Sequence, residues 1–255
     1  MRGPEAADWL QGQLTQDLQG MALGESRFSL VLSPQGKLDS FCRVTRTADD
    51  SFLLDTEEGY GDGLESRLRR FKLRVKVELE PVQVVSSEAG TGRLDALGPP
   101  RVTTDPPAAR RGDESALEEA RIRAGRPRLG RELTERTIPQ EAGEAFVART
   151  VSFEKGCYTG QELVARLDAR GSNVPRRLRL IEGRLPAPPP AEKTALWIGD
   201  EEVGEVTSAA RSGDSFVALG YLKRSAAGRE PLEVELGRRE GPRTSAVVSL
   251  LPPEL

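Results

Sequence analysis

The sequence predicts an α+β fold, with antiparallel sheets and helices in the N-terminal and middle parts and a small antiparallel β-barrel at the C-terminal end. Three observations predict it. Apolar segments on both sides of residues 33–36 indicate a β-hairpin, Leu64, Leu68 and Phe71 recur at helical spacing, and six short strand-like segments follow Gly171. Short strands at this spacing, separated by turn residues, are typical of small barrels.

The composition is that of an ordinary globular protein. The chain has 255 residues, of which 37% are hydrophobic and 30% are charged. This length suits about two domains. The net charge of −3 provides no general attraction to nucleic acid or membranes. No apolar run approaches the ~20 residues that a membrane span needs, and the N-terminus lacks a signal-peptide pattern. We therefore expect a cytoplasmic protein that binds neither nucleic acid nor membranes directly.

The chain contains no histidine and two cysteines, Cys42 and Cys157. The missing histidine excludes Ser-His-Asp and Cys-His catalysis and histidine ligation of metals. Two cysteines cannot supply the four ligands of a usual zinc or iron–sulfur site. We therefore expect no self-contained metal site, because any cluster would need ligands from outside the chain. A disulfide between the two cysteines is not expected in a reducing compartment.

The N-terminal part predicts a helix followed by three antiparallel strands. The helix covers Pro4–Leu14, with Pro4 near its first turn. Phe28–Leu32 and Lys37–Thr47 form a hairpin around the S-P-Q-G turn at 33–36, in which serine, proline and glycine suit a type I turn. Phe52–Leu54 gives the third strand.

The next part predicts a helix around Leu64–Phe71 and a half-buried strand at Val75–Leu79. A basic run lies across both elements: Arg67, Arg69, Arg70, Lys72, Arg74 and Lys76. Such a run can hold a polyanion, but it is more often the solvated face of a helix and strand, and we favour the solvated face. Gly90–Gly112 predicts a loop or linker.

The middle part carries the stretch with the most chemistry, K-G-C-Y-T-G-Q-E at 155–162. It follows a predicted helix at Glu114–Ala124. Thr159 and Glu162 have the spacing of a capping box, so a helix is expected to begin near Gly160 and to stop at Gly171. Cys157 would then face the positive end of the helix dipole, near the Lys155 ammonium, and both effects favour a thiolate. Local physics leaves a second interpretation open, in which the cysteine is a small buried hydrophobic residue.

Glycines flank the cysteine at Gly156 and Gly160, where they allow backbone torsions or close approaches that a side chain would forbid. Beyond Gly171, six predicted strands build the barrel. They are Arg177–Ile181, Thr194–Ile198, Val203–Ser208, Phe216–Leu222, Leu232–Leu236 and Ser245–Leu250.

The eight-residue motif resembles the signature of the YgfZ family, whose members are folate-binding relatives of the glycine-cleavage T-protein. Other similar stretches extend the resemblance over nearly the whole chain: Trp9–Leu18, Arg121–Leu133, Thr137–Gly143, Gly204–Ala209 and Ala218–Arg224. The resemblance implies a T-protein-like fold in three parts. We expect an N-terminal folate-binding part at 1–112 without the family's first strand and helix, a middle segment at 113–172 packing with it, and the barrel at 173–255.

The resemblance also implies a function, which is folate-dependent help in assembling or repairing iron–sulfur proteins such as tRNA-modifying enzymes. Cys157 would be the working residue, with Lys155 beside it. The rest of the motif would support them through Gly156, Tyr158, Gly160, Gln161 and Glu162. The expected partners are iron–sulfur client proteins, and the expected ligand is tetrahydrofolate or a related folate.

A pterin ring offers an edge that a carboxylate can grip with two hydrogen bonds, and a glutamate tail calls for a cation. Glu141 is the candidate carboxylate and Arg149 a candidate tail contact. Where the T-protein pattern has a glutamate that contacts pterin, this chain has Arg123. Two alternatives remain: a one-carbon transferase of the aminomethyltransferase kind, which would use Asp39, and a scaffold that binds partners without a ligand.

Overall fold

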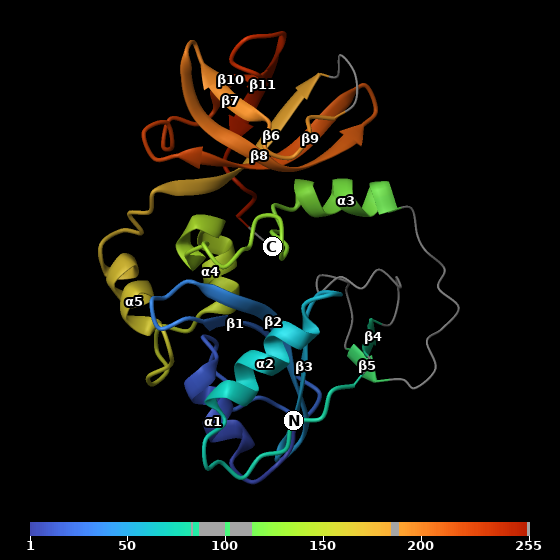
Figure 1. Cartoon of the computed structure of the whole chain (residues 1–255), viewed down its shortest axis with the longest axis vertical. Helices are drawn as coiled ribbons and strands as arrows, with labels where there is room; N and C mark the ends of the chain where they lie inside the picture. The colour runs from blue at the N-terminus through green and yellow to red at the C-terminus, as the bar shows by residue number, and fades with distance from the viewer. Residues whose placement is uncertain (83, 87–99, 103–113, 185–188, 254–255) are drawn as a thin grey trace. The chain divides into compact units, whose positions relative to one another are not determined.

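The computed structural model describes residues 1–82, 84–86, 100–102, 114–184 and 189–253. The chain divides into two compact units (Figure 1). Unit 1 comprises Met1–Gly112, Thr134–Arg136 and Ala148–Asp168, and unit 2 comprises Asp113–Leu133, Thr137–Val147 and Ala169–Leu255. The predicted middle segment 113–172 is thus shared between the two units.

Unit 1 is built on a three-stranded antiparallel sheet in the order β1-β2-β3. Its strands are β1 (Ser26–Leu32), β2 (Leu38–Ala48) and β3 (Ser51–Asp55). Two helices, α1 (Ala6–Gln13) and α2 (Gly61–Phe71), contribute Leu10, Leu64 and Leu68 to a core shared with Val31 and Val44 of the sheet. The predicted helices and the hairpin are confirmed. The turn closes with a hydrogen bond from Gly36 N–H to Ser33 O at 2.9 Å.

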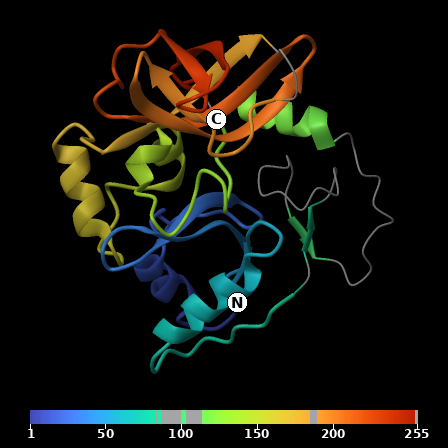
Figure 2. The same cartoon turned by 45° about the horizontal axis from the view of Figure 1, so that its top comes forward.

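Unit 2 is organised around a closed six-stranded barrel in the order β10-β11-β6-β9-β8-β7, whose curvature Figure 2 shows. Its strands are β6 (Arg176–Arg184), β7 (Ala195–Ile198), β8 (Glu201–Ser212), β9 (Ser215–Lys223), β10 (Leu232–Gly237) and β11 (Arg243–Ser249). Every neighbouring pair is antiparallel. Alternate residues fill the interior, among them Val206, Phe216 and Val234. All six predicted strands and the barrel are confirmed.

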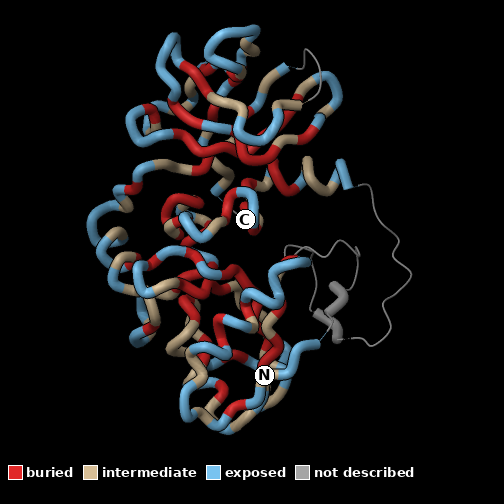
Figure 3. The backbone as a smooth tube through the Cα atoms, viewed as in Figure 1, coloured by how far each residue is buried: buried red, intermediate tan, exposed pale blue. Residues whose placement is uncertain are grey.

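The shorter elements complete the two units. In unit 2, α3 (Glu114–Arg123) lies against β8 and β9 through Ile122, and the 3-10 turn η1 (Pro139–Ala142) lies near β6. The short helix α4 (Glu144–Thr150) runs across the division between the units, and α5 (Gln161–Ala169) ends at it. Figure 3 shows the buried stretches concentrated in the strands of each unit.

Two sequence-based expectations need correction. The strand predicted at Val75–Leu79 is reduced to one bridge between Glu78 and Arg2, because only the few residues before α1 are available as a partner and Arg74 adopts a left-handed φ of 57°. The loop predicted at Gly90–Gly112 contains a strand, β5 (Pro100–Val102), which pairs with β4 (Val84–Ser86). The rest of that predicted loop lies outside the described residues.

Candidate functional site

The motif at 155–162 is fixed to the C-terminal end of α1 through Lys155. The Lys155 ammonium donates hydrogen bonds to the carbonyl oxygens of Gln11, Leu14 and Gln16 at 2.7, 2.7 and 2.9 Å. The end of a helix leaves carbonyl groups without intrahelical partners and carries partial negative charge. Lys155 therefore supplies the cation that this end of α1 lacks, and it joins two family-like stretches that lie 139 to 144 residues apart.

Burial changes the acid–base behaviour of this contact. Burial lowers the pKa of the Lys155 ammonium from 10.5 to about 8, and the nearby Asp17 carboxylate opposes that change. The ammonium lies 5.3 Å from the ring centroid of Tyr158, whose own pKa is raised by burial to about 12. An ammonium has three N–H donors, and three carbonyl oxygens accept from this one. Lys155 thus anchors the motif, and its expected effect on the Cys157 thiol remains a prediction.

Backbone hydrogen bonds hold the segment on both sides of Lys155. The buried Thr15 hydroxyl donates to Thr150 O at 2.6 Å, and Ser152 N–H donates to Thr15 O at 3.0 Å. Beyond the cysteine, Thr159 N–H donates to Gly12 O at 3.1 Å. The loop that contains Cys157 is therefore fixed at its start, middle and end to the last turn of α1 and the connection that follows it.

Two glycines lock the end of the motif against the β1–β2 hairpin. Gly160 has a φ of +83°, and a Cβ added there would lie 2.4 Å from Ser33 O. Gly36 has a φ of +73°, and its added Cβ would lie 2.7 Å from Leu163 Cβ. The expected need for glycine holds at Gly160, because a side chain would clash and the left-handed φ disfavours other residues. It does not hold at Gly156, where an added Cβ would meet nothing within 4 Å.

The beginning of α5 differs in detail from the predicted capping box. The helix starts at Gln161, and it is the Gln161 side chain that turns back, accepting a hydrogen bond from Tyr158 N–H at 3.1 Å. Glu162 is exposed. Glutamine at the first helical position performs the task expected of glutamate one residue later, so the predicted start is right within one residue and the predicted capping pair is wrong.

The two cysteines differ in accessibility. Cys157 is exposed and Cys42 is buried in the unit 1 core, and both are free thiols. Burial raises the pKa of the Cys42 thiol far above its usual range, which disfavours the reactive thiolate form. Four residues before Cys157, the side chain of Phe153 is 44% exposed, a feature that no pattern in the sequence indicated. The motif therefore presents an accessible thiol on a fixed loop that also carries an exposed aromatic ring four residues earlier.

Asp39, the carboxylate required by the transferase alternative, already has a cationic partner. Its Oδ2 accepts a hydrogen bond from Arg67 Nε at 2.8 Å. Arg67 also donates to Leu32 O at 3.0 Å, and its guanidinium lies 3.6 Å from the ring centroid of Phe71. Arg67 was expected on a solvated basic face, but its side chain is only 8% exposed. The expectation holds for Arg69, Arg70, Arg74 and Lys76, which are exposed.

The candidate pterin contacts in unit 2 have side-chain partners there. Glu141 is buried, and its Oε2 accepts a hydrogen bond from Arg176 Nε at 3.1 Å. Arg123 donates to Glu119 and Glu182 at 3.0 and 3.1 Å and to the Ser212 hydroxyl at 2.7 Å. The glutamate therefore does not present a free carboxylate edge, and the arginine is neutralised by two carboxylates.

Arg149, the expected tail contact, belongs to unit 1. Its guanidinium lies 4.2 Å from the ring centroid of Phe28, and that ring stacks on Phe41 with 5.6 Å between centroids. A guanidinium over a pair of rings is a stacked cation–π arrangement. Glu141 and Arg123 stand in unit 2, so the three predicted folate contacts come from two different units.

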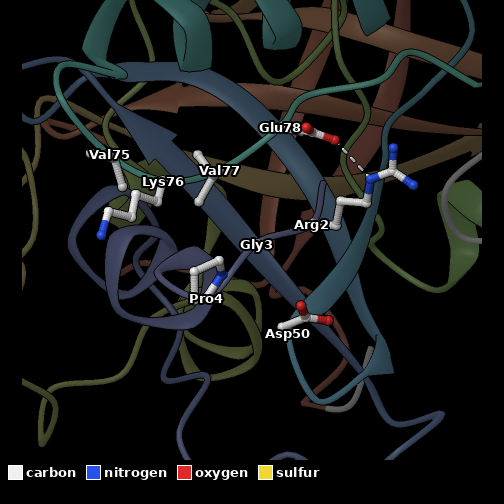
Figure 4. A pocket seen from close by; sticks show the side chains of 8 residues that line it. All are labelled: Arg2, Gly3, Pro4, Asp50, Val75, Lys76, Val77 and Glu78. Carbon is white, nitrogen blue, oxygen red and sulfur yellow. Dashed lines mark hydrogen bonds and ion pairs between the residues drawn. The ribbon is translucent and has the colours of Figure 1, made fainter.

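Two surface hollows lie elsewhere. One, of about 500 Å³, is beside the N-terminus and is lined by Arg2, Pro4 and Glu78 among others (Figure 4). The other, of about 440 Å³, is on the barrel unit beside Arg123. Neither is lined by a residue of the motif. Within the described parts of the chain, no group of three or more His, Cys, Asp or Glu side chains could hold a metal ion, and no helix is long and apolar enough to cross a membrane.

Comparisons with known proteins give relatives but no family profile. No protein-family model matches the sequence. The chain is 30% identical over 190 residues to an uncharacterized protein of Haemophilus influenzae, covering 68% of this chain and 66% of that protein, just under two thirds of its length. It is 29% identical to the tRNA-modifying protein YgfZ of Edwardsiella ictaluri, over 98% of this chain and 88% of that protein. It is 27% identical to the mitochondrial iron-sulfur cluster assembly factor of Mus musculus, over 97% of this chain and 81% of that protein.

A solved structure confirms the fold. The crystal structure of the glycine cleavage system aminomethyltransferase T from Bartonella henselae superimposes with a TM-score of 0.74, covering 98% of this chain and 82% of that one. The sequences are 20% identical, so the likeness shows the fold alone. The T-protein-like architecture expected from the resemblance is therefore confirmed.

Proposed function

We propose that this chain is a YgfZ-family protein that acts as an accessory protein in the assembly or repair of iron–sulfur proteins, with Cys157 as its working residue. The names of its relatives support both halves of this role, tRNA modification and iron–sulfur cluster assembly. Iron–sulfur enzymes that modify tRNA are the clients that would connect them. A cytoplasmic location stays a prediction.

One observation carries the proposal: the fold fixes the motif in place and leaves its thiol outside. Lys155, Thr159 and Gly160 are occupied by contacts with α1 and with the hairpin turn. Tyr158 is buried. Cys157 is exposed in the middle of these fixed residues. A reactive group held in one position loses little conformational freedom when it meets its target, which favours reaction.

A thiolate is a soft ligand for iron and the nucleophile of thiol–disulfide exchange. Cys157 could ligate iron transiently at an open position, displace a ligand from the iron of a damaged centre, or attack a client disulfide to form a mixed disulfide while the second client sulfur leaves as a thiolate. These three routes stay open. A single accessible thiol supplies one ligand of the four that a cluster needs. The cluster is therefore substrate or cargo of this protein, with its other ligands supplied by the client.

Folate binding is the second part of the proposal, and the residues expected to hold the pterin do not fit it. Glu141 is paired with Arg176, and Arg123 is paired with two glutamates. Arg149, the expected tail contact, stacks on the Phe28 ring. The proposal that this chain binds tetrahydrofolate thus rests on its relatives and its fold alone. We assign folate no part in the chemistry of Cys157.

A thermal-shift titration tests folate binding directly. Tetrahydrofolate at a hundred times its dissociation constant should stabilise the protein by roughly 2.7 kcal/mol. The shift should shrink at equal ligand concentration in Arg149→Ala. No shift in the wild-type protein at millimolar tetrahydrofolate would remove folate from the proposal and would favour the scaffold alternative.

The transferase alternative is less well supported. It needs the Asp39 carboxylate to face a substrate amine, whereas this carboxylate is already held by the Arg67 guanidinium at 2.8 Å. Turnover of a methylamine-type donor with tetrahydrofolate, lost in Asp39→Asn, would establish that alternative.

The decisive experiment is complementation of a bacterial strain that lacks its own YgfZ-family gene. The measured quantity is the level of a tRNA nucleoside made by an iron–sulfur enzyme, determined by mass spectrometry. We expect Cys157→Ser to abolish the restoration while leaving the thermal unfolding midpoint unchanged. Cys42→Ala, which alters the buried thiol, is the matched control and should restore the nucleoside. Full restoration by Cys157→Ser would overturn the proposed function.

A further inference from the structure

We propose that Phe153, Gly156 and Cys157 form a docking surface for the client protein. The Phe153 ring would enter an apolar pocket of the client, and basic residues of the client would surround that pocket. The proposal rests on the proposed function and names the surface through which it would operate. Phe153 is 44% exposed and stands four residues before the exposed Cys157. Aromatic side chains at the centre of an interface contribute much of its binding energy.

The loop holds Phe153 outward through contacts on both sides of it. Val151 is buried, and Ser152 N–H donates to Thr15 O at 3.0 Å. Lys155, two residues beyond Phe153, is fixed by three hydrogen bonds. An aromatic ring on a fixed loop has little freedom left to lose when a partner binds, so its burial favours association more than that of a ring on a mobile loop. The fold thus leaves both ring and thiol exposed on the same fixed loop.

Gly156 is explained by a partner and not by the fold. The chain packs closely at Gly160, but at Gly156 a Cβ would meet nothing within 4 Å, and this glycine is exposed. The missing side chain leaves open space directly beside Cys157. That space lets the backbone of a partner approach the sulfur, which a larger residue would prevent.

The charges of the segment indicate which kind of macromolecule fits. Between 152 and 162 the charged residues are Glu154, Lys155 and Glu162. The Lys155 ammonium is used by the carbonyl groups of α1, whereas Glu154 and Glu162 are exposed. The exposed charged side chains of this segment are therefore both carboxylates, which repel RNA phosphates and suit a protein surface with a basic rim.

Complementation in the same strain tests the surface, with the tRNA nucleoside as the readout. Phe153→Ala and Gly156→Val should each reduce its rate of formation by roughly tenfold or more, as expected for loss of a central interface contact. Phe153→Leu, which remains apolar, should retain a large part of the rate. Tyr60→Ala is the matched control, because Tyr60 is an aromatic residue of unit 1 with 38% exposure, and it should behave like the wild-type protein.

The outcomes separate this inference from the proposed function. Unchanged rates in both Phe153→Ala and Gly156→Val, with Cys157→Ser inactive, would refute the docking surface and leave the proposed function standing. If Cys157→Ser is active, the proposed function fails, and the rates of the Phe153 and Gly156 variants still decide the surface. Thermal unfolding midpoints equal to wild type show that the variants fold. Fluorescence anisotropy with purified tRNA tests whether the surface binds RNA instead of a protein. If the wild-type protein binds tRNA and Phe153→Ala abolishes that binding, the proposal that a protein docks here is refuted.

Discussion

Replacing Lys155 by methionine removes the ammonium that joins the motif to α1 and keeps most of the side-chain volume. Three carbonyl oxygens, of Gln11, Leu14 and Gln16, lose their donor. We expect the loop around Cys157 to open locally more often, because Lys155 is the middle one of its three attachments.

The expected magnitude follows from the contacts. A hydrogen bond to a charged group contributes roughly 1.5–3 kcal/mol, and a buried carbonyl left without a donor costs about 1–3 kcal/mol. These contributions do not sum, because desolvation of the ammonium, which lowers the pKa of Lys155 to about 8, opposes them. Water also reaches this half-buried site. We expect the free energy of local opening to fall by about 2 kcal/mol, equal to a roughly 30-fold rise in the open population.

Amide hydrogen exchange measures that opening. The amides to follow are Ser152 and Thr159, which donate to Thr15 O and Gly12 O. Their protection should drop about 30-fold in Lys155→Met. The exposed Lys76 of the same unit provides the control, since Lys76→Met should leave both amides unchanged. Protection of both amides within twofold of wild type in Lys155→Met would refute the anchoring role.

Three further predictions test the surroundings of the motif. Gly160→Ala should lower the free energy of unfolding by roughly 3 kcal/mol, since it combines a left-handed φ with a Cβ 2.4 Å from Ser33 O. Gly156→Ala should change that free energy by less than about 0.5 kcal/mol. Urea titration compares the two variants, and equal midpoints would contradict the packing argument. Thr15→Val should lower the free energy of unfolding by about 2 kcal/mol, because the hydroxyl both donates to Thr150 O and accepts from Leu30 N–H. Thr15→Ser, which keeps the hydroxyl, should be nearly as stable as wild type in the same titration. A valine variant as stable as wild type would show that the hydroxyl contributes nothing. The pKa of Lys155 is about 8 in the folded chain and 10.5 without burial, so between these pH values the unfolded chain binds more protons and stability rises with pH. Urea titrations should therefore show that the wild-type protein gains stability relative to Lys155→Met from pH 7.5 to pH 10.5. A relative loss would contradict the direction of the pKa shift.

Much of the fold could be predicted because most of its helices and strands have recognisable local sequence patterns. The six barrel strands and the hairpin around Ser33–Gly36 have alternating apolar residues and turn residues at each end. The strand predicted at Val75–Leu79 has the same alternation but failed. Alternation shows which face of a segment is buried, whereas a strand also needs a neighbour to pair with, and here that neighbour is little more than Arg2.

The candidate site was predictable in position and less so in its contacts. The motif indicated Cys157, and of the two glycines expected to be needed because they flank it, the structure supports Gly160 and not Gly156. The contacts of Lys155 with residues 11–16 join segments about 140 positions apart, and no local pattern encodes such a pairing. Arg67 was misjudged for the same reason, because its burial depends on Asp39 and Phe71. Exposure of Phe153 is likewise a tertiary property.

The geometry also changes how substitutions in the motif should be interpreted. Lys155 and Gly160 have complete structural explanations in their contacts with α1 and the hairpin turn. A loss of function after changing either residue reports first on the position of the loop. Cys157 and Gly156 are exposed and have no such explanation within the described residues. Neither the exposed thiol of Cys157 nor the open space at Gly156 contributes a packing contact to the fold. Loss of function without loss of stability at these two positions would therefore identify chemistry or docking.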